Sequence, residues 1–101
     1  QMAAGFALCE DLGINSKGVP TKDSLKKYNT LNAVDMPAVK AILVEEGGDK
    51  GPFGAKSIGE ISTVPGAAAI VNAVNNALGT SIRELPLTPE RIVEAFRLIK
   101  G

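Results

Sequence analysis

The sequence contains no histidine and no tryptophan, and it has only one cysteine and one tyrosine. Because histidine is the side chain that ordinarily titrates near neutrality, proton transfer near pH 7 must fall to a carboxylate, a lysine, Tyr28 or Cys9, with a pKa moved by its surroundings. A single cysteine cannot form an internal disulfide or supply the thiolates of a structural zinc site or an iron–sulfur cluster. These absences exclude a redox metal held by the thiols of this chain and favour an intracellular, cytoplasmic location.

An excess of charge of one sign is also missing, because 11 basic and 11 acidic residues cancel. The chain therefore lacks the basic surface that nucleic acids and anionic membranes attract. Its apolar runs are interrupted by Gly, Pro, Asn or charged residues well short of the roughly 18 residues that a membrane span needs, and no signal peptide precedes them. We expect a soluble protein with no nucleic acid and no membrane as partner.

The length and the first residue bear on domain organisation. With 101 residues, 45% of them hydrophobic, the chain can form one core, and a second independent core is not expected. It begins at Gln1, directly inside an apolar stretch without a capping residue, which indicates a segment of something longer. We predict a single domain over residues 1–101 that is the C-terminal part of a larger subunit.

The first half of the chain carries one helical pattern and one strand-like pattern. Residues 2–12 are alanine-rich, with apolar residues at three- and four-residue spacing, and Gly13 follows, which predicts a helix with a glycine stop. Residues 38–44 are a short apolar run with β-branched residues, bounded by Pro37 and by acidic residues and glycines, which predicts a largely buried strand. The residues between, 15–35, are rich in turn formers and are predicted to be mostly irregular.

The strongest helical signal follows the centre of the chain. A helix is predicted from a cap at Ser62 or Thr63, through Pro65 in its first turn, to a stop at Gly79. The small residues at 66–69 would let the beginning of this helix approach another backbone closely. Its asparagines fall together on the opposite face, which is interpreted as a solvated face.

A third helix is predicted to begin after a cap at Thr88 and to bury Ile92, Val93, Phe96 and Ile99. No internal repeat or low-complexity tract is present. The patterns together predict an α+β fold with three helices, one short buried strand and a glycine-rich loop.

The glycine-rich loop at residues 47–60 ends in an acidic residue, Glu60. A phosphate-binding loop needs a glycine, four residues and then Gly-Lys-Ser or Gly-Lys-Thr opening directly into a helix. Here Ala55 intervenes before Lys56, and Gly59 interrupts the expected helix, so the pattern is not met. A connecting loop whose glycines serve turn geometry is one alternative. Another is a noncatalytic interaction module whose loop binds an anionic ligand or a partner subunit.

A family resemblance covers nearly the whole chain. Gly-Pro-Phe-Gly-Ala-Lys-Ser-Ile-Gly-Glu at 51–60, an alanine-rich helix and Arg-Glu-Leu-Pro-Leu-Thr-Pro-Glu-Arg-Ile at 83–92 occur in this order. This order resembles the C-terminal end of the molybdenum-binding subunit of the xanthine dehydrogenase and aldehyde oxidoreductase family. Residues 1–6 are similar to the family's glutamine-led helix, and residues 28–37 are similar to its tyrosine-to-proline linker.

The resemblance implies a fragment of a larger molybdopterin-binding domain in which Glu60 is the catalytic base. Gln1 would hydrogen-bond the cofactor, with Gly59 as a second cofactor-binding residue, and no residue of this chain would ligate the metal. A high-valent metal lowers the pKa of water, so a nearby carboxylate of raised pKa can take the proton and leave an oxygen nucleophile. The substrate implied is an electron-poor carbon of a purine or a related heterocycle.

The resemblance also implies what lies outside this segment. The cofactor would be molybdopterin, in its cytosine dinucleotide form, while iron–sulfur clusters and FAD would be held by other domains or subunits. The partners would be the remainder of the molybdenum subunit, the iron–sulfur and FAD subunits or domains, and a small-molecule substrate. The segment alone would be inactive.

Overall fold

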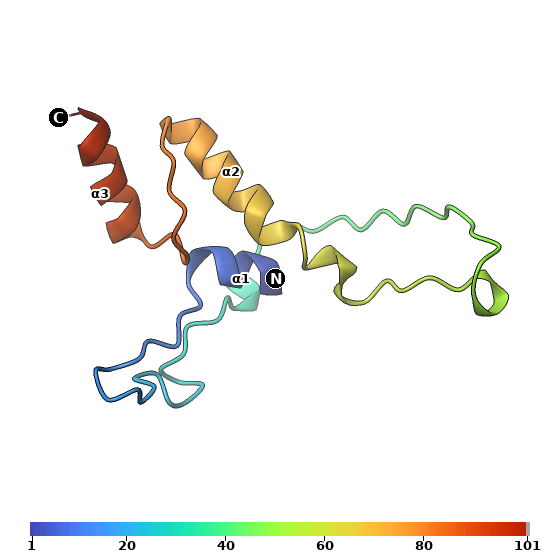
Figure 1. The fold of residues 1–101 in the computed structure, drawn as a ribbon, viewed down its shortest axis with the longest axis horizontal. Helices are drawn as coiled ribbons and strands as arrows, with labels where there is room; N and C mark the ends of the chain where they lie inside the picture. The colour runs from blue at the N-terminus through green and yellow to red at the C-terminus, as the bar shows by residue number, and fades with distance from the viewer. Residues whose placement is uncertain (101) are drawn as a thin grey trace.

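The computed structural model describes residues 1–100 and contains three α-helices joined by long irregular segments (Figure 1). The helices are α1 (Met2–Leu8), α2 (Gly66–Leu78) and α3 (Pro89–Lys100), and there are three single-turn 3-10 helices, η1 (Ala33–Asp35), η2 (Pro52–Gly54) and η3 (Glu60–Ser62). The three helices predicted from the sequence are therefore confirmed.

The first helix ends at Leu8 rather than at Leu12. The backbone amides of Cys9 and Glu10 both donate to the carbonyl of Gly5, at 3.0 and 2.8 Å, so the chain turns back over the last helical turn. The acidic side chains therefore lie beyond the helix and not in its last turn, where the helix dipole would disfavour them.

The predicted strand at residues 38–44 is wrong. This segment is irregular, and the one β-bridge within residues 1–100 joins Ile14 to Pro20. A strand requires a neighbouring strand to satisfy its backbone groups, and the described chain places none beside residues 38–44. The large apolar side chains of this run are at least 66% exposed, so the predicted burial is wrong too. The described chain is all-α, not α+β.

The packed part of the molecule, which we call the hub, consists of α1, α2 and residues 80–88. The two helices meet near their first residues, where Gly66 of α2 lies against Ala3 of α1. Ala7 and Leu87 are 0% and 2% exposed, and the Leu87 amide donates to the Ala7 carbonyl at 2.6 Å. This hydrogen bond joins the segment before α3 to the end of α1 and closes a small core.

A second region, which we call the excursion, comprises residues 37–59. It leaves the hub after η1, extends away from the helices and returns at η3 (Figure 1). Phe53 lies in η2 at its tip, fully exposed and with a φ of 54°, a left-handed conformation that is uncommon for residues other than glycine. The excursion therefore places its aromatic and aliphatic side chains at the surface.

The overall dimensions reflect this division. The radius of gyration is 17.8 Å, whereas a compact domain of this length would have about 13 Å. The accessible surface is 8420 Å², compared with about 5400 Å² for a compact monomer of the same mass. The fold therefore exposes apolar surface that an independent domain would bury.

The third helix begins as predicted from the sequence. The Thr88 carbonyl accepts from the Ile92 amide at 3.1 Å, and the Thr88 hydroxyl accepts from the Arg91 amide at 3.4 Å. The predicted burial is only partly confirmed, because Ile92 and Phe96 are half-buried whereas Val93 and Ile99 are 49% and 54% exposed.

Candidate functional site

Glu60 opens η3, the turn that leads from the excursion into α2. The carbonyl of Glu60 accepts from the Thr63 amide at 2.9 Å, and this bond fixes the backbone of the turn. The side chain of Glu60 is exposed. A Cβ built on the preceding Gly59 would meet no atom within 4 Å, so the space beside Gly59 is open.

The two arms of the excursion are fastened to each other by a lysine. Lys56 Nζ donates to the carbonyl of Glu46 at 2.9 Å. At the same place the Gly48 carbonyl would lie 2.8 Å from a Cβ on Gly54, whose φ of 69° also suits glycine. The ammonium group of Lys56 therefore binds a backbone carbonyl and closes the loop, instead of binding an anion.

A hollow of about 1190 Å³ lies between these arms. Residues 39–47 form one side, and Gly54, Lys56, Ser57 and Ile58 form the other, with Ile61 and Ser62 of η3 at its base. Glu60 is not one of the lining residues, although its neighbours Ile58 and Ile61 are. Glu60 is thus a sequence neighbour of lining residues but does not itself line the hollow.

Gln1 precedes the first residue of α1, and its carbonyl accepts from the Gly5 amide at 2.9 Å. Its side-chain Nε2 donates to the carbonyl of Leu31 in the linker before η1. A primary amide has a second N–H and an oxygen, so this bond leaves it with further hydrogen-bonding capacity. Gln1 is exposed.

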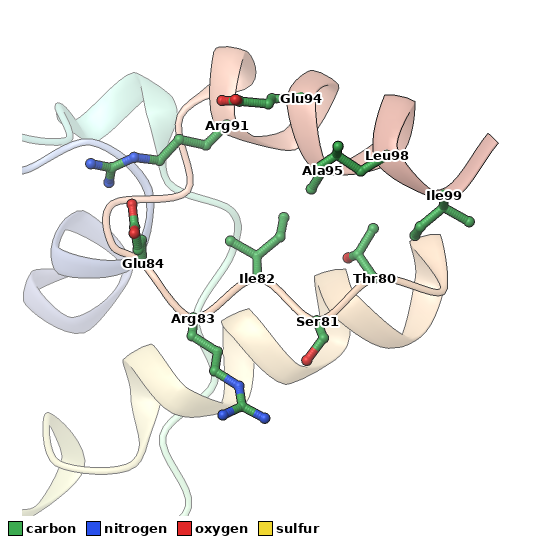
Figure 2. Close-up of a pocket in the computed structure, with 10 residues that line it drawn as sticks. All are labelled: Thr80, Ser81, Ile82, Arg83, Glu84, Arg91, Glu94, Ala95, Leu98 and Ile99. Atoms are coloured by element: carbon green, nitrogen blue, oxygen red, sulfur yellow. The ribbon is translucent and has the colours of Figure 1, made fainter. Parts of the chain in front are cut away.

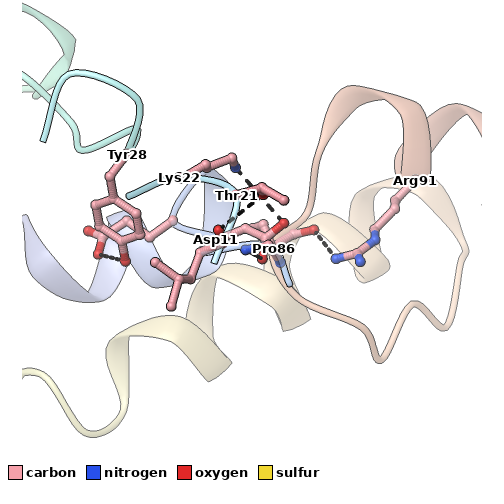
Figure 3. Close-up of polar contacts among 9 residues, drawn as sticks. Asp11, Thr21, Lys22, Tyr28, Pro86 and Arg91 are labelled. Carbon is pink, nitrogen blue, oxygen red and sulfur yellow. Dashed lines mark hydrogen bonds and ion pairs between the residues drawn. The ribbon is translucent and has the colours of Figure 1, made fainter. Parts of the chain in front are cut away.

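A polar cluster at the other end of α1 connects that helix to the linker (Figure 3). The Tyr28 hydroxyl donates to Glu10 Oε2 at 2.9 Å, and this hydrogen bond, followed by partial burial and the charge of Glu10, raises the pKa of Tyr28. Partial burial, followed by the negative charges of Glu10 and Asp35, raises the pKa of Cys9 against the opposing effect of Lys22. Cys9 is therefore kept as a thiol, which agrees with a packing role.

A second hollow, of about 560 Å³, separates α3 from residues 80–84 (Figure 2). Ile82 points from one side toward α3, and Ala95 and Ile99 of α3 point from the other. Arg91 Nη1 at its edge donates to the Pro86 carbonyl at 2.9 Å. Glu60 is not among the residues that line this hollow, so the two do not form one site.

Asn75 is a structural residue that the sequence analysis did not recognise. Its Nδ2 donates to the Ile82 carbonyl at 2.9 Å, and its Oδ1 accepts from the Thr80 hydroxyl and the Ile82 amide, both at 2.8 Å. The side chain therefore fixes the turn after α2. Asparagine at the end of a helix could have suggested such a local bond.

Within residues 1–100, no three side chains of the Cys, Asp and Glu types come together in a way that could hold a metal ion. None of the helices in that range combines the length and the apolar character that a bilayer crossing requires.

Sequence comparison relates the chain to large oxidoreductases. It is 41% identical over 98 residues to the putative xanthine dehydrogenase molybdenum-binding subunit of Escherichia coli K12, covering 96% of this chain and 13% of that protein. It is 34% identical over 100 residues to the aldehyde oxidoreductase of Megalodesulfovibrio gigas, covering 92% of this chain and 10% of that protein. The chain belongs to this molybdenum hydroxylase family.

Other relatives agree with the assignment to the molybdenum hydroxylases. The probable hypoxanthine oxidase of E. coli K12 is 37% identical over 98 residues, which is 96% of this chain and 10% of that protein. The chain thus spans about an eighth or less of the length of these relatives. No family model matches it. The family resemblance predicted from residues 51–60 and 83–92 is therefore confirmed.

The structure places the elements that carry the predicted site residues next to each other. Gln1 lies at the beginning of α1 and Glu60 lies just before α2, and the two helices meet at Ala3 and Gly66. Figure 1 shows the N-terminus near the beginning of α2. Both residues, and Gly59 with them, therefore lie at one end of the hub, where the excursion also begins and ends.

Proposed function

We propose that the protein to which this chain belongs is a molybdenum hydroxylase that uses water to hydroxylate an electron-poor carbon of a purine or a related heterocycle. The observation that carries the proposal is the match of 96% of the chain to a protein named as a molybdenum-binding subunit. A purine substrate is favoured because relatives named xanthine dehydrogenase and hypoxanthine oxidase share 41% and 37% of the aligned residues.

The cofactor proposed is molybdopterin, in its cytosine dinucleotide form, with iron–sulfur clusters and FAD held by other domains or subunits. The residues present suit a group that brings its own metal ligands, because the described chain offers an exposed carboxylate, an exposed amide and a glycine beside open space. Gln1 would hold the cofactor through its amide, and Gly59 would let it approach the backbone. When bound, the molybdenum centre would activate water and accept the electrons of the oxidation.

Glu60 is proposed as the general base that takes a proton from this water. The motif at residues 51–60 ends in Glu60, and η3 holds this residue just before α2, whose first residue contacts α1 close to Gln1. A glutamate becomes a better base near neutrality when partial burial raises its pKa. Glu60 is exposed in this segment, so the remainder of the subunit would have to supply that burial.

The exposed apolar side chains of the excursion favour the remainder of the subunit as the partner that this segment binds. Its aliphatic side chains at residues 39–44 and the ring of Phe53 are exposed, and the relatives are several times longer than this chain. Surface of this kind marks an interaction site. We expect backbone amides at 38–48, which donate no hydrogen bond within the described residues, to exchange rapidly in the 101-residue chain and slowly in the full-length protein. Rapid exchange in both proteins would contradict this assignment.

Replacement of the proposed base tests the proposed function. In the full-length protein, Glu60→Gln keeps the size of the side chain but removes the basic oxygen, so turnover should fall by about 100-fold or more while molybdenum content stays unchanged. Glu94→Gln makes the same chemical change at an exposed carboxylate of α3, outside the proposed site and outside the excursion, and should leave turnover nearly unchanged. Near-normal turnover in Glu60→Gln would exclude Glu60 as the base.

A further inference from the structure

The contact between α1 and α2 depends on a glycine. A Cβ built on Gly66 would lie 2.4 Å from the Cβ of Ala3 and 3.9 Å from its Cα. Carbon atoms in van der Waals contact are about 3.5–4.0 Å apart, so the space between these helices admits one methyl group and not two. The small residues at 66–69 predict a close approach to another backbone. The structure confirms this approach and shows that α2 contacts Ala3 there.

Neither helix geometry nor helix propensity requires glycine at this position. Gly66 does not have a positive φ, and alanine is the better helix former. A β-carbon cannot rotate away from a clash as a long side chain can, so alanine at Gly66 would have to push one helix backbone from the other by about 1 Å. The property of glycine that matters here is therefore the absence of a side chain facing Ala3.

This contact lies between the two proposed site residues. Gln1 lies immediately before α1, two residues ahead of Ala3. Glu60 is joined to Gly66 through η3, whose backbone is fixed by the hydrogen bond from the Thr63 amide to the Glu60 carbonyl. We propose that Gly66 is a positioning residue, which sets the place of Gln1 relative to Glu60 through its contact with Ala3. This inference rests on the proposed function, since Gln1 and Glu60 are the groups that it positions.

The test uses the full-length protein with Gly66→Ala, Ala3→Gly and the double variant. A displacement of about 1 Å between a cofactor-binding group and a base can reduce the rate by about 100-fold, so Gly66→Ala should lower kcat strongly and KM little. The double variant again has one methyl group at the contact, and it should recover most of the lost turnover. Ala68→Ser adds one heavy atom to an exposed position of the same helical turn and should have no effect.

Two readouts do not depend on turnover. Gly66→Ala should accelerate amide exchange in Met2–Leu8 and at Thr63, and it should lower the molybdenum and pterin content if Gln1 is displaced from the cofactor. Both quantities should return toward normal in the double variant. A stability effect unrelated to the contact would not be reversed by removing the methyl group of Ala3.

The outcomes separate this inference from the proposed function. Unchanged turnover in Gly66→Ala, or a loss that Ala3→Gly does not restore, would overturn the positioning role. Normal turnover in Glu60→Gln would overturn the proposed base and, with it, the positioning of Gln1 relative to Glu60. Rescue of exchange and of cofactor content in the Gly66 variants is measured without reference to Glu60, so it would still show that Gly66 places Gln1.

Discussion

The hub and the excursion contain similar apolar side chains, but the hub buries some of them, whereas the excursion exposes all of its large ones. In the hub, Leu87 is 2% exposed and its amide is bonded to Ala7, whereas in the excursion Leu43 is 66% exposed. The hub has two helices whose small residues allow close contact, and the excursion has no second element of the described chain to pack against. The difference shows that hydrophobic sequence becomes a core only where a partner surface exists.

The two regions also differ in how their backbones are held. The turn after α2 is fixed by three hydrogen bonds of Asn75, and the linker is tied to α1 through Gln1 and Tyr28. Across the arms of the excursion, one side-chain bond connects Lys56 to the Glu46 carbonyl. Glu60 lies in η3, between the excursion and α2, and thus at the border of the two regions.

Substitution of leucines tests the comparison most strongly. Leu87→Ala in the 101-residue chain should reduce the free energy of unfolding by about 3 kcal/mol, because it leaves a cavity in the small core. The matched change Leu43→Ala removes the same atoms from an exposed position and should alter it by less than about 0.5 kcal/mol. Urea unfolding followed by far-ultraviolet circular dichroism would measure both, and equal losses would contradict the division into hub and excursion.

A smaller loss of stability is expected when Asn75, which holds the turn after α2, is replaced. Asn75→Ala removes three hydrogen bonds from a half-buried site and should cost about 2 kcal/mol. Asn72→Ala, on the exposed face of the same helix, should be nearly neutral and serves as the control. The same unfolding measurement applies, and a neutral Asn75→Ala would mean that the turn is held by other contacts.

The smallest effect concerns the contact of Tyr28 with Glu10. Because the pKa of Tyr28 is raised above its ordinary 10.0 in the folded chain, its contribution to stability is complete below about pH 10 and is lost as the pH rises through the folded pKa. Tyr28 is the only tyrosine and there is no tryptophan, so tyrosinate absorbance reports this residue alone. Glu10→Gln should lower the midpoint toward 10, whereas Glu94→Gln should leave it unchanged. A wild-type midpoint at or below the ordinary value would show that the hydrogen bond is absent in solution.

Several features could be predicted because they depend on neighbours in the sequence. The stop of α2 at Gly79, with a φ of 65°, and the Thr88 cap of α3 follow from local backbone geometry. The family resemblance was likewise carried by contiguous residues at 51–60 and 83–92. Local rules failed at α1, where Leu8 and not Leu12 is the last residue because the chain folds back onto Gly5.

The candidate site was predictable only in part. The motif singled out Glu60, and the similarity of residues 1–6 to the family's glutamine-led helix singled out Gln1, but nothing in their spacing indicated that the helices beside them meet. That placement depends on Ala3 and Gly66, which are more than 60 residues apart in sequence. A role for Glu60 and Gln1 in catalysis stays a prediction, which the variants described above test.

By itself, the sequence determined which segments form the three α-helices, where α2 ends, where α3 begins and to which family the chain belongs, because these properties follow from short-range geometry and contiguous motifs. The predicted cap of α2 at Ser62 or Thr63 is wrong, because η3 occupies Glu60–Ser62 and α2 begins at Gly66 after Pro65. Only the tertiary structure decided which apolar residues are buried and which backbone groups find partners. The run at 38–44 illustrates the reason. Its composition favours burial and strand pairing, but both require a second surface at the right distance, and local sequence cannot show whether the described chain supplies one.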